Sequence, residues 1–330
     1  MQEGACQGRA VRRRSIWLQP ARRRLSLFVS LFAIGGPAQA GTLETIRQAG
    51  VVHCGAAARP GFADIGENGR ITGLGVDLCR AVTIAVLGPT GRSAFRIYAS
   101  AHDYDAVRTG ADEVAFLTAD AVAEQDLAGS IIPGPVAFIA ELTALAQPGA
   151  DVKPSSTAVC ILTGSRSHQA LEAWADRTHA LLARIGFQET TEMHDAFDAH
   201  RCGMMAGEAS ELAEFQAGSA RRAGARILPA FGLLPVFAAT STADGVWAGL
   251  VGWALGAVIQ SEAAPSSWRS DLPGTKISGL RGSWQADVSA ALGSYGAMLD
   301  RNLGARSRLV VRPGPNAPWP DGMLLPPGPR

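Results

Sequence analysis

The chain has 330 residues, of which 47% are hydrophobic and 18% are charged, and its formal net charge is +1. This composition excludes a disordered or collagen-like protein, because there is enough apolar surface to offset the conformational entropy lost on folding. The length predicts roughly two domains or one body of two lobes. The charge is uneven: residues 1–40 carry seven arginines and one acidic residue, and the rest carry 23 basic and 28 acidic residues. The mildly acidic remainder disfavours nucleic acid or an anionic membrane surface as a partner.

The first 40 residues have the parts of a secretory signal peptide. Two arginine clusters, 12–14 and 22–24, precede an apolar stretch at 25–34, and residues 38–40 read Ala-Gln-Ala. A basic segment, a short apolar core and an A-x-A site are typical of a cleaved leader. The apolar stretch is well below the ~20 residues that span a bilayer, which disfavours an uncleaved anchor. We therefore expect export with cleavage after Ala40, by either the Sec or the twin-arginine route.

Helix and strand patterns alternate after the leader. In chain order we expect a helix at 42–49, a strand at 51–54, a helix at 74–87 ending at a glycine, a strand at 95–98, a helix at 102–109, a strand at 157–162 and a helix at 168–185. An apolar segment at 246–259 predicts a buried helix, because it is too short to span a membrane. Alternation of this kind predicts an α/β fold with largely parallel sheets.

Four cysteines follow the leader: Cys54, Cys79, Cys160 and Cys202. An even number in an exported chain indicates two disulfides, for which three connectivities exist. Sequence order favours Cys54–Cys79 and Cys160–Cys202, one in each half. A metal site is disfavoured, because the chain has no C-x-x-C pair and no histidine pair with zinc-finger spacing. We expect neither a metal nor a cofactor.

Sequence motifs of common enzyme classes are absent from this sequence or incomplete in it. No G-x-S-x-G motif occurs, which disfavours an α/β-hydrolase. The stretch at 73–78 begins like a dinucleotide-binding loop, but Leu78 stands where the third glycine belongs, so the start of a helix is the better interpretation. The six histidines are scattered. These patterns do not call for an enzyme.

Several short sequence motifs, spread over residues 41–330, match one known family when they are taken together. They lie at 41–46, 51–55, 60–62, 73–82, 159–165, 200–202, 294–304 and 316–327. Together they resemble the solute-binding proteins of polar amino-acid ABC importers (family 3), in particular the general L-amino-acid-binding type. The resemblance also supports the cysteine pairing favoured by sequence order.

The resemblance implies a two-lobed periplasmic-binding-protein fold of type II. Each lobe would be a mostly parallel sheet flanked by helices, and two strands would form the hinge between them. Lobe one would comprise 41–143 plus 234–330, and lobe two would comprise 144–233. Such a protein is a periplasmic monomer that closes over an amino acid or related small polar solute and delivers it to a membrane ABC permease.

The ligand-binding positions depart from the family pattern. An arginine normally clamps the carboxylate of the amino acid, but Gln125 stands in its place, preceded by Thr118 and by an acidic residue, Asp120. Truncating such a buried charged partner typically costs ~2–5 kcal/mol of binding free energy. In the second half, Ser165 and Arg166 replace the usual Gly-Thr-Thr helix start.

The acid that holds the ammonium group is replaced by Glu208, with Ser210 two residues later. Arg166 is either a substitute clamp or a solvent-facing arginine. Phe62 either stacks on the ligand or belongs to the core. Two other functions stay open: a sensor or partner-binding module that has lost the ligand, and a dehydratase-like enzyme, for which Asp120 and Glu208 are the only candidate acid–base pair.

Overall fold

The computed structural model describes residues 41–330 except 67, 101–102, 128, 151–156, 264–278, 312–313, 318–321, 323 and 325–330, and the side chains of 125–127 and 262–263 also lie outside the description. The expected leader and its cleavage site at Ala40 therefore fall outside the described residues. Residues 40–330 cluster into one unit, to which the following description applies. Within the described part of this unit, no helix is both long and apolar enough to cross a membrane.

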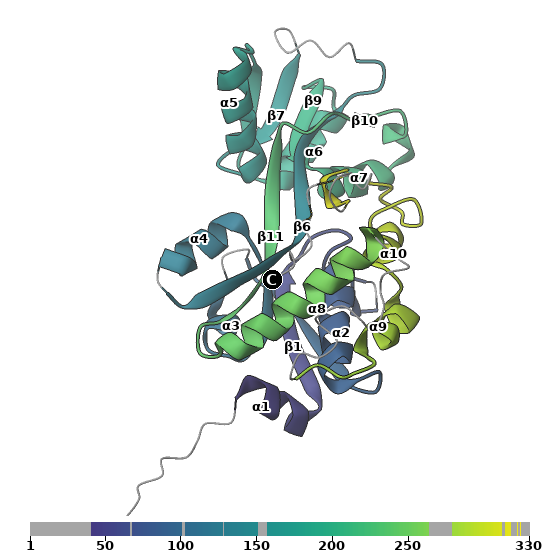
Figure 1. Ribbon diagram of the computed structural model, residues 1–330. Helices are drawn as coiled ribbons and strands as arrows, with labels where there is room; N and C mark the ends of the chain where they lie inside the picture. The colour runs from purple at the N-terminus through teal and green to yellow at the C-terminus, as the bar shows by residue number, and fades with distance from the viewer. Residues whose placement is uncertain are drawn as a thin grey trace, which may run out of the picture. The chain divides into compact units, whose positions relative to one another are not determined.

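Strands of the described residues form a nine-stranded sheet with two parallel groups (Figure 1). The first strand group is β4 (Arg92–Tyr98), β1 (Val51–Ala57) and β5 (Val114–Thr118), all parallel. The second strand group is β9 (Met204–Glu208), β7 (Ala158–Leu162) and β8 (Ala183–Phe187), again all parallel. The inner strands β1, β5, β7 and β9 are mostly buried and apolar, which is typical of parallel strands covered by helices on both faces.

Two long antiparallel strands connect these groups. They are β6 (Ile131–Ala146) and β11 (Gly232–Ser241), which pair with each other along most of their length. β11 also pairs with β5 of the first group, whereas β6 pairs with β9 of the second. The short strand β10 (Arg226–Ile227) pairs with β6, and β2 (Asp64–Ile65) forms a separate hairpin with β3 (Ile71–Thr72). Figure 1 shows β6 and β11 side by side as the connection between the two groups.

Helices cover both faces of the first strand group. One face carries α1 (Thr42–Ala49), α2 (Leu74–Leu87), α8 (Gly245–Ala263), α9 (Trp284–Leu292) and α10 (Tyr295–Asn302), and the other carries α3 (Asp105–Arg108) and α4 (Ala119–Leu127). The larger core lies under α2 and α8, where Leu78, Ile84, Leu255 and Val258 are completely buried. Burial of apolar side chains at about 25 cal/mol per Å² is the main stabilising term here.

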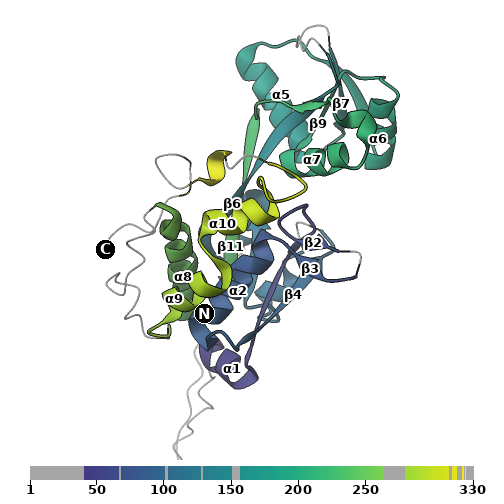
Figure 2. The ribbon, with the colours of Figure 1, turned by 90° about the vertical axis from the view of Figure 1, so that its right-hand side faces the viewer.

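The second strand group is covered in the same way. α5 (Arg166–Thr178) packs on one face, while α6 (Thr190–Asp198) and α7 (Ala209–Ala217) pack on the other (Figure 2). Two 3₁₀ turns, at Ala220–Arg222 and Gly314–Asn316, complete the described elements. The second of them reaches β6, where the Asn316 side chain bonds both the N–H and the C=O of Ile139.

Both predicted disulfides are confirmed. Cys54–Cys79 links β1 to α2, and Cys160–Cys202 links β7 to the loop that precedes β9. Each bond therefore joins a central parallel strand of one group to a neighbouring segment. Because the four cysteines are almost completely buried, the bonds lie within the two cores.

Most expected elements agree with the structure, but one expected helix was wrong at its end. The helices expected at 42–49 and 74–87 match α1 and α2, and the apolar segment 246–259 lies within α8. The expected helix at 168–185 is instead α5 followed by the strand β8, because His179 adopts a left-handed conformation (φ 55°) and ends the helix. Residue 185 then pairs with Cys160 of β7.

Candidate functional site

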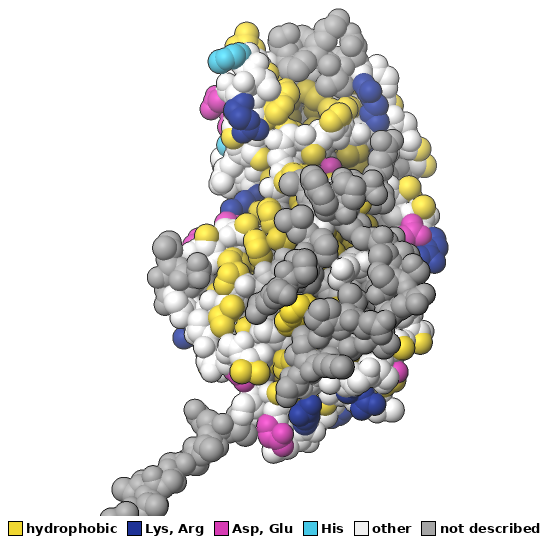
Figure 3. All heavy atoms as spheres, viewed as in Figure 1, with side chains coloured by type: hydrophobic (Ala, Val, Ile, Leu, Met, Phe, Trp, Pro, Cys, Tyr) yellow, Lys and Arg dark blue, Asp and Glu magenta, His cyan; other side chains and the backbone are white. Residues whose placement is uncertain are grey.

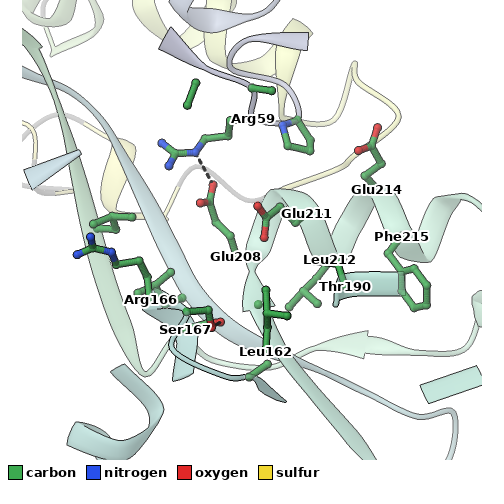
Figure 4. Close-up of a pocket in the computed structure, with 18 of the residues that line it drawn as sticks. Arg59, Leu162, Arg166, Ser167, Thr190, Glu208, Glu211, Leu212, Glu214 and Phe215 are labelled. Carbon is green, nitrogen blue, oxygen red and sulfur yellow. Dashed lines mark hydrogen bonds and ion pairs between the residues drawn. The ribbon is translucent and has the colours of Figure 1, made fainter. Parts of the chain in front are cut away.

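A pocket of about 750 Å³ lies where the carboxyl ends of both strand groups converge. On the first side it is lined by residues 57–60 at the end of β1 and just after it, by Tyr98 at the end of β4 and by Thr118 at the end of β5. On the second side the lining comes from the end of β7, from Glu208 at the end of β9, and from residues of α5, α6 and α7 (Figure 4). Ligands of open α/β sheets bind at the carboxyl ends of strands.

A buried ion pair crosses this pocket. The Nε of Arg59, in the loop after β1, lies 3.0 Å from Oε1 of Glu208 at the end of β9. Their side chains are only 13% and 8% exposed. The hydroxyl of Ser210 donates a second hydrogen bond to the same carboxylate oxygen at 3.1 Å. Buried charges are retained when they are paired and hydrogen-bonded, and this pair meets both conditions.

A second ion pair also joins the two strand groups, but with the basic and acidic residues on the opposite sides. Arg166, the first residue of α5, contacts Asp120 in the first turn of α4. The arginine thus comes from the second strand group and the acid from the first, the reverse of Arg59 and Glu208. Partial burial lowers the pKa of Arg166 from its usual value. The contact with Asp120 shows that Arg166 is not simply a solvent-facing arginine.

The start of α5 offers further polar groups. Ser165 is the N-cap, and its Oγ accepts a hydrogen bond from the N–H of His168 at 3.1 Å. The hydroxyls of Ser165 and Ser167 lie 3.0 Å apart, and both residues line the pocket. Unsatisfied N–H groups and the helix dipole make such a helix start favourable for an anion.

Glu211 adds a third titratable acid to the pocket. Its side chain is open to the solvent of the pocket but is surrounded by protein, and this desolvation raises its pKa from 4.5 to about 7. The negative charge of Glu208 raises the pKa further, whereas the positive charge of Arg59 lowers it.

Thr118 and Phe62 lie beside Arg59 but in different environments. Both line a small hollow next to the pocket together with Arg59. Thr118 is 6% exposed, and its Oγ1 has no hydrogen-bond partner among the described residues. Phe62 is 1% exposed, and its ring packs 5.5 Å from that of Phe116 and 5.4 Å from that of Phe138. These contacts give Phe62 a core position, the second of the two roles expected from the sequence.

The structure gathers most of the predicted site residues. Thr118, Ser165, Arg166 and Glu208 line the pocket, and Asp120 and Ser210 contact two of them. Gln125 lies in α4, but its side chain is outside the described residues.

Arg59 and Glu211 were missed from the sequence. A charged residue directly after a buried strand and before a Pro-Gly turn was a signal for Arg59. In the described residues, no group of three or more His, Cys, Asp or Glu side chains is placed to hold a metal ion.

Comparisons with known proteins identify the class to which this architecture belongs. A solved ABC transporter periplasmic binding protein from Brucella ovis, with glutathione bound, superimposes with a TM-score of 0.69 at 22% identity, covering 86% of this chain and 97% of that one. The mixed α/β fold is thus a periplasmic-binding-protein fold, as predicted. No protein-family model matches the sequence.

Curated relatives make the assignment more specific. The general L-amino acid-binding periplasmic protein AapJ of Rhizobium johnstonii is 26% identical, covering 89% of this chain and 94% of the relative. The glutamate/glutamine/aspartate/asparagine-binding protein BztA of Rhodobacter capsulatus is 25% identical, covering 88% of this chain and 94% of the relative. The chain is a homologue of the periplasmic amino-acid-binding proteins of ABC transporters, which confirms the resemblance seen in the sequence.

Proposed function

We propose that this protein is a periplasmic receptor that binds an amino acid or a related small polar solute and delivers it to an ABC permease. The observation that carries the proposal is the pocket at the carboxyl ends of both strand groups, in which arginines and carboxylates face each other. The named specificities of AapJ and BztA support the solute class. Export with removal of the leader after Ala40 and action as a monomer belong to the same proposal.

Closure of two lobes would follow from the connection between the strand groups. In our proposal, 41–143 plus 234–330 form one lobe and 144–233 form the other. Both boundaries fall inside β6 and β11, the strands shared by the two groups. A pair of long strands that crosses between lobes is suited to act as a hinge, because small backbone changes there rotate whole lobes.

The pocket chemistry suits a zwitterion. A carboxylate accepts strong hydrogen bonds from a guanidinium group, and both Arg59 and Arg166 place a guanidinium group at the pocket. An ammonium group is neutralised by carboxylates, and Glu208 and Glu211 lie together on the second side of the pocket. The volume of about 750 Å³ falls in the range of about 300–1,000 Å³ that is typical of ligand pockets.

A thermal-shift screen of the exported protein tests this function. The probes are the proteinogenic amino acids and glutathione, each at millimolar concentration. A solute at 100 times its Kd adds about 2.7 kcal/mol to the free energy of unfolding, so a bound solute should raise Tm by several degrees. Absence of a shift with every solute would contradict the receptor function.

A sensor that needs no solute is a second candidate. The two crossing ion pairs, Arg59–Glu208 and Arg166–Asp120, already join the strand groups. Such a protein would present this arrangement to a partner whatever the solute concentration. A screen without any shift, together with capture of a specific periplasmic partner, would favour it.

An enzyme is a third candidate, supported by Glu211. A carboxyl group with a pKa of about 7 in a pocket is suited to general acid–base catalysis. By contrast, Asp120 and Glu208, the pair expected from the sequence, are each engaged by an arginine. Conversion of a bound solute to a new product, detected by mass spectrometry and lost in the Glu211→Gln variant, would establish this alternative.

A further inference from the structure

The guanidinium group of Arg59 has donors beyond those used by Glu208. Its Nε faces Glu208, and among the described residues its two Nη groups have no hydrogen-bond partner. Figure 4 shows these terminal nitrogens directed away from Glu208. Because a guanidinium group has five N–H donors in a planar fork, it can hold one carboxylate through Nε and a second through its Nη groups.

The hydroxyl group of Thr118 also favours a carboxylate next to Arg59. It is a buried polar atom without a partner among the described residues, and Thr118 lines the pocket together with Arg59. Buried hydroxyl groups are normally hydrogen-bonded, and an unsatisfied one typically costs about 1–3 kcal/mol. A carboxylate oxygen seated against Arg59 would accept this hydrogen bond. Arg59 and Thr118 are therefore placed together on the first side of the pocket with donors that suit an anion.

A second place for an anion lies on the opposite side. Arg166 and the hydroxyl groups of Ser165 and Ser167 surround the start of α5, a helix of 13 residues. The two arginines come from different strand groups, so they approach the pocket from different sides. The two arginines thus offer two separate places for a carboxylate, while Glu208 and Glu211 lie together on the second side of the pocket.

We propose that the preferred solute carries two carboxylates and an ammonium group. One carboxylate binds Arg59 and Thr118, the other binds Arg166 at the start of α5, and the ammonium group faces Glu208 and Glu211. Acidic amino acids and short peptides with two free carboxylates both have this chemistry. The inference rests on the proposed receptor function and specifies its solute class.

Two matched pairs of solutes test the inference by isothermal titration calorimetry. L-Glutamate and L-glutamine differ by one carboxylate, as do glutathione and its glycine monoethyl ester. The diacid of at least one pair should bind at least tenfold more tightly than its partner, because loss of a hydrogen-bonded charge costs about 1.5–3 kcal/mol. The pair that responds distinguishes a free amino acid from a short peptide.

Single-residue variants test which side chains produce the preference for the diacid. Arg59→Ala should weaken binding of the diacid at least 30-fold and remove its advantage over the matched solute. Thr118→Val, which keeps the shape of the buried side chain, should reduce that advantage about tenfold. Arg166→Ala should weaken both members of a pair alike. Arg70→Ala, an exposed arginine outside the pocket lining, is the matched control and should leave all affinities unchanged.

The outcomes separate this inference from the receptor function. Equal affinity for both members of each pair would overturn the inference and leave the receptor function standing. The same holds if only solutes with a single carboxylate bind, or if Thr118→Val and Arg59→Ala leave the ratio unchanged. Absence of binding by any amino acid or peptide would contradict both.

Discussion

At the scale of single residues, the pocket is organised by reciprocal charge pairs. Arg59 of the first strand group faces Glu208 of the second, and Arg166 of the second faces Asp120 of the first. Each arginine is thereby held at the pocket wall by an acid from the other side. A solute with charges of both signs can exchange with these partners without leaving a buried charge unpaired, which is the main penalty for charges in a protein interior.

The position of Glu211 leads to a pH-dependent prediction. Its pKa in the folded protein is about 7, above the ordinary 4.5, because of desolvation and the charge of Glu208, which Arg59 only partly offsets and to which Glu214 adds. A raised pKa contributes stability that is complete below pH 4.5 and is lost as the pH rises through 7. Glu211→Gln should therefore match the wild type in Tm near pH 4.5 and exceed it at pH 8.

The test is a series of thermal melts of both proteins across this pH range. Glu211→Ala should show the same pH dependence relative to the wild type, which separates loss of the charge from a change in packing. A constant Tm difference between pH 4.5 and 8 would show that Glu211 does not titrate in this interval.

Residue identities in the site could be predicted only in part. Glu208, Ser210, Ser165 and Thr118 were identified because the resemblance to the solute-binding family marks their positions as ligand-binding ones. The pairing of Arg59 with Glu208 joins residues far apart in the sequence, and a single sequence does not contain that distance. For the same reason the acid that engages Arg166 was not foreseen, although Asp120 itself was noted as a nearby charge.

At the scale of elements, helix ends that a glycine marks were predictable from the sequence, whereas a strand formed by tertiary pairing was not. α1 and α2 were predicted to the residue, because Gly50 and Gly88 mark their ends. β8 was missed because its alternating side chains continue the helical-looking sequence of α5 without a glycine or proline between them. A tertiary pairing with β7, not a local propensity, gives this segment its extended form.

Gly73, just before α2, has a conformation that other residues tolerate poorly. Its φ is 130°, and a Cβ there would lie 2.3 Å from the carbonyl oxygen of Phe62. Gly73→Ala should lower the free energy of unfolding by about 2–5 kcal/mol, because backbone strain and overpacking add. Gly110→Ala is the control: φ is 77° there, but no atom lies within 4 Å of the added Cβ, so only strain of about 1–2 kcal/mol is expected. Equal losses in urea denaturation would refute the steric argument.

The two disulfides should stabilise the protein to a similar extent. They close separations of 25 and 42 residues, for which the chain-entropy relation gives about 3–4 kcal/mol each. The double variants Cys54→Ala/Cys79→Ala and Cys160→Ala/Cys202→Ala should each lower the free energy of unfolding, measured by urea denaturation, by this amount. A loss below about 1 kcal/mol in either variant would mean that the unfolded chain is not appreciably restricted by that bond.

At the scale of the whole described unit, function depends on two strand groups that share β6 and β11. On the face shown in Figure 3, basic and acidic side chains of the described residues are scattered rather than gathered into one field. The charges that define the site are instead concentrated inside the pocket. The regular strand–helix alternation predicted the α/β class, and the family resemblance predicted two lobes joined by two strands. The selectivity of the pocket depends on side-chain pairs that only the folded chain brings together.

The central claim is that a solute in the pocket draws the two strand groups together about β6 and β11. Small-angle X-ray scattering of the exported protein, with and without the solute that gives the largest thermal shift, tests it most directly. We predict a reproducible decrease in the radius of gyration on addition of the solute, reversed on its removal, and absent in the Arg59→Ala variant at the same solute concentration. A solute that binds tightly and leaves the radius of gyration unchanged would contradict the account.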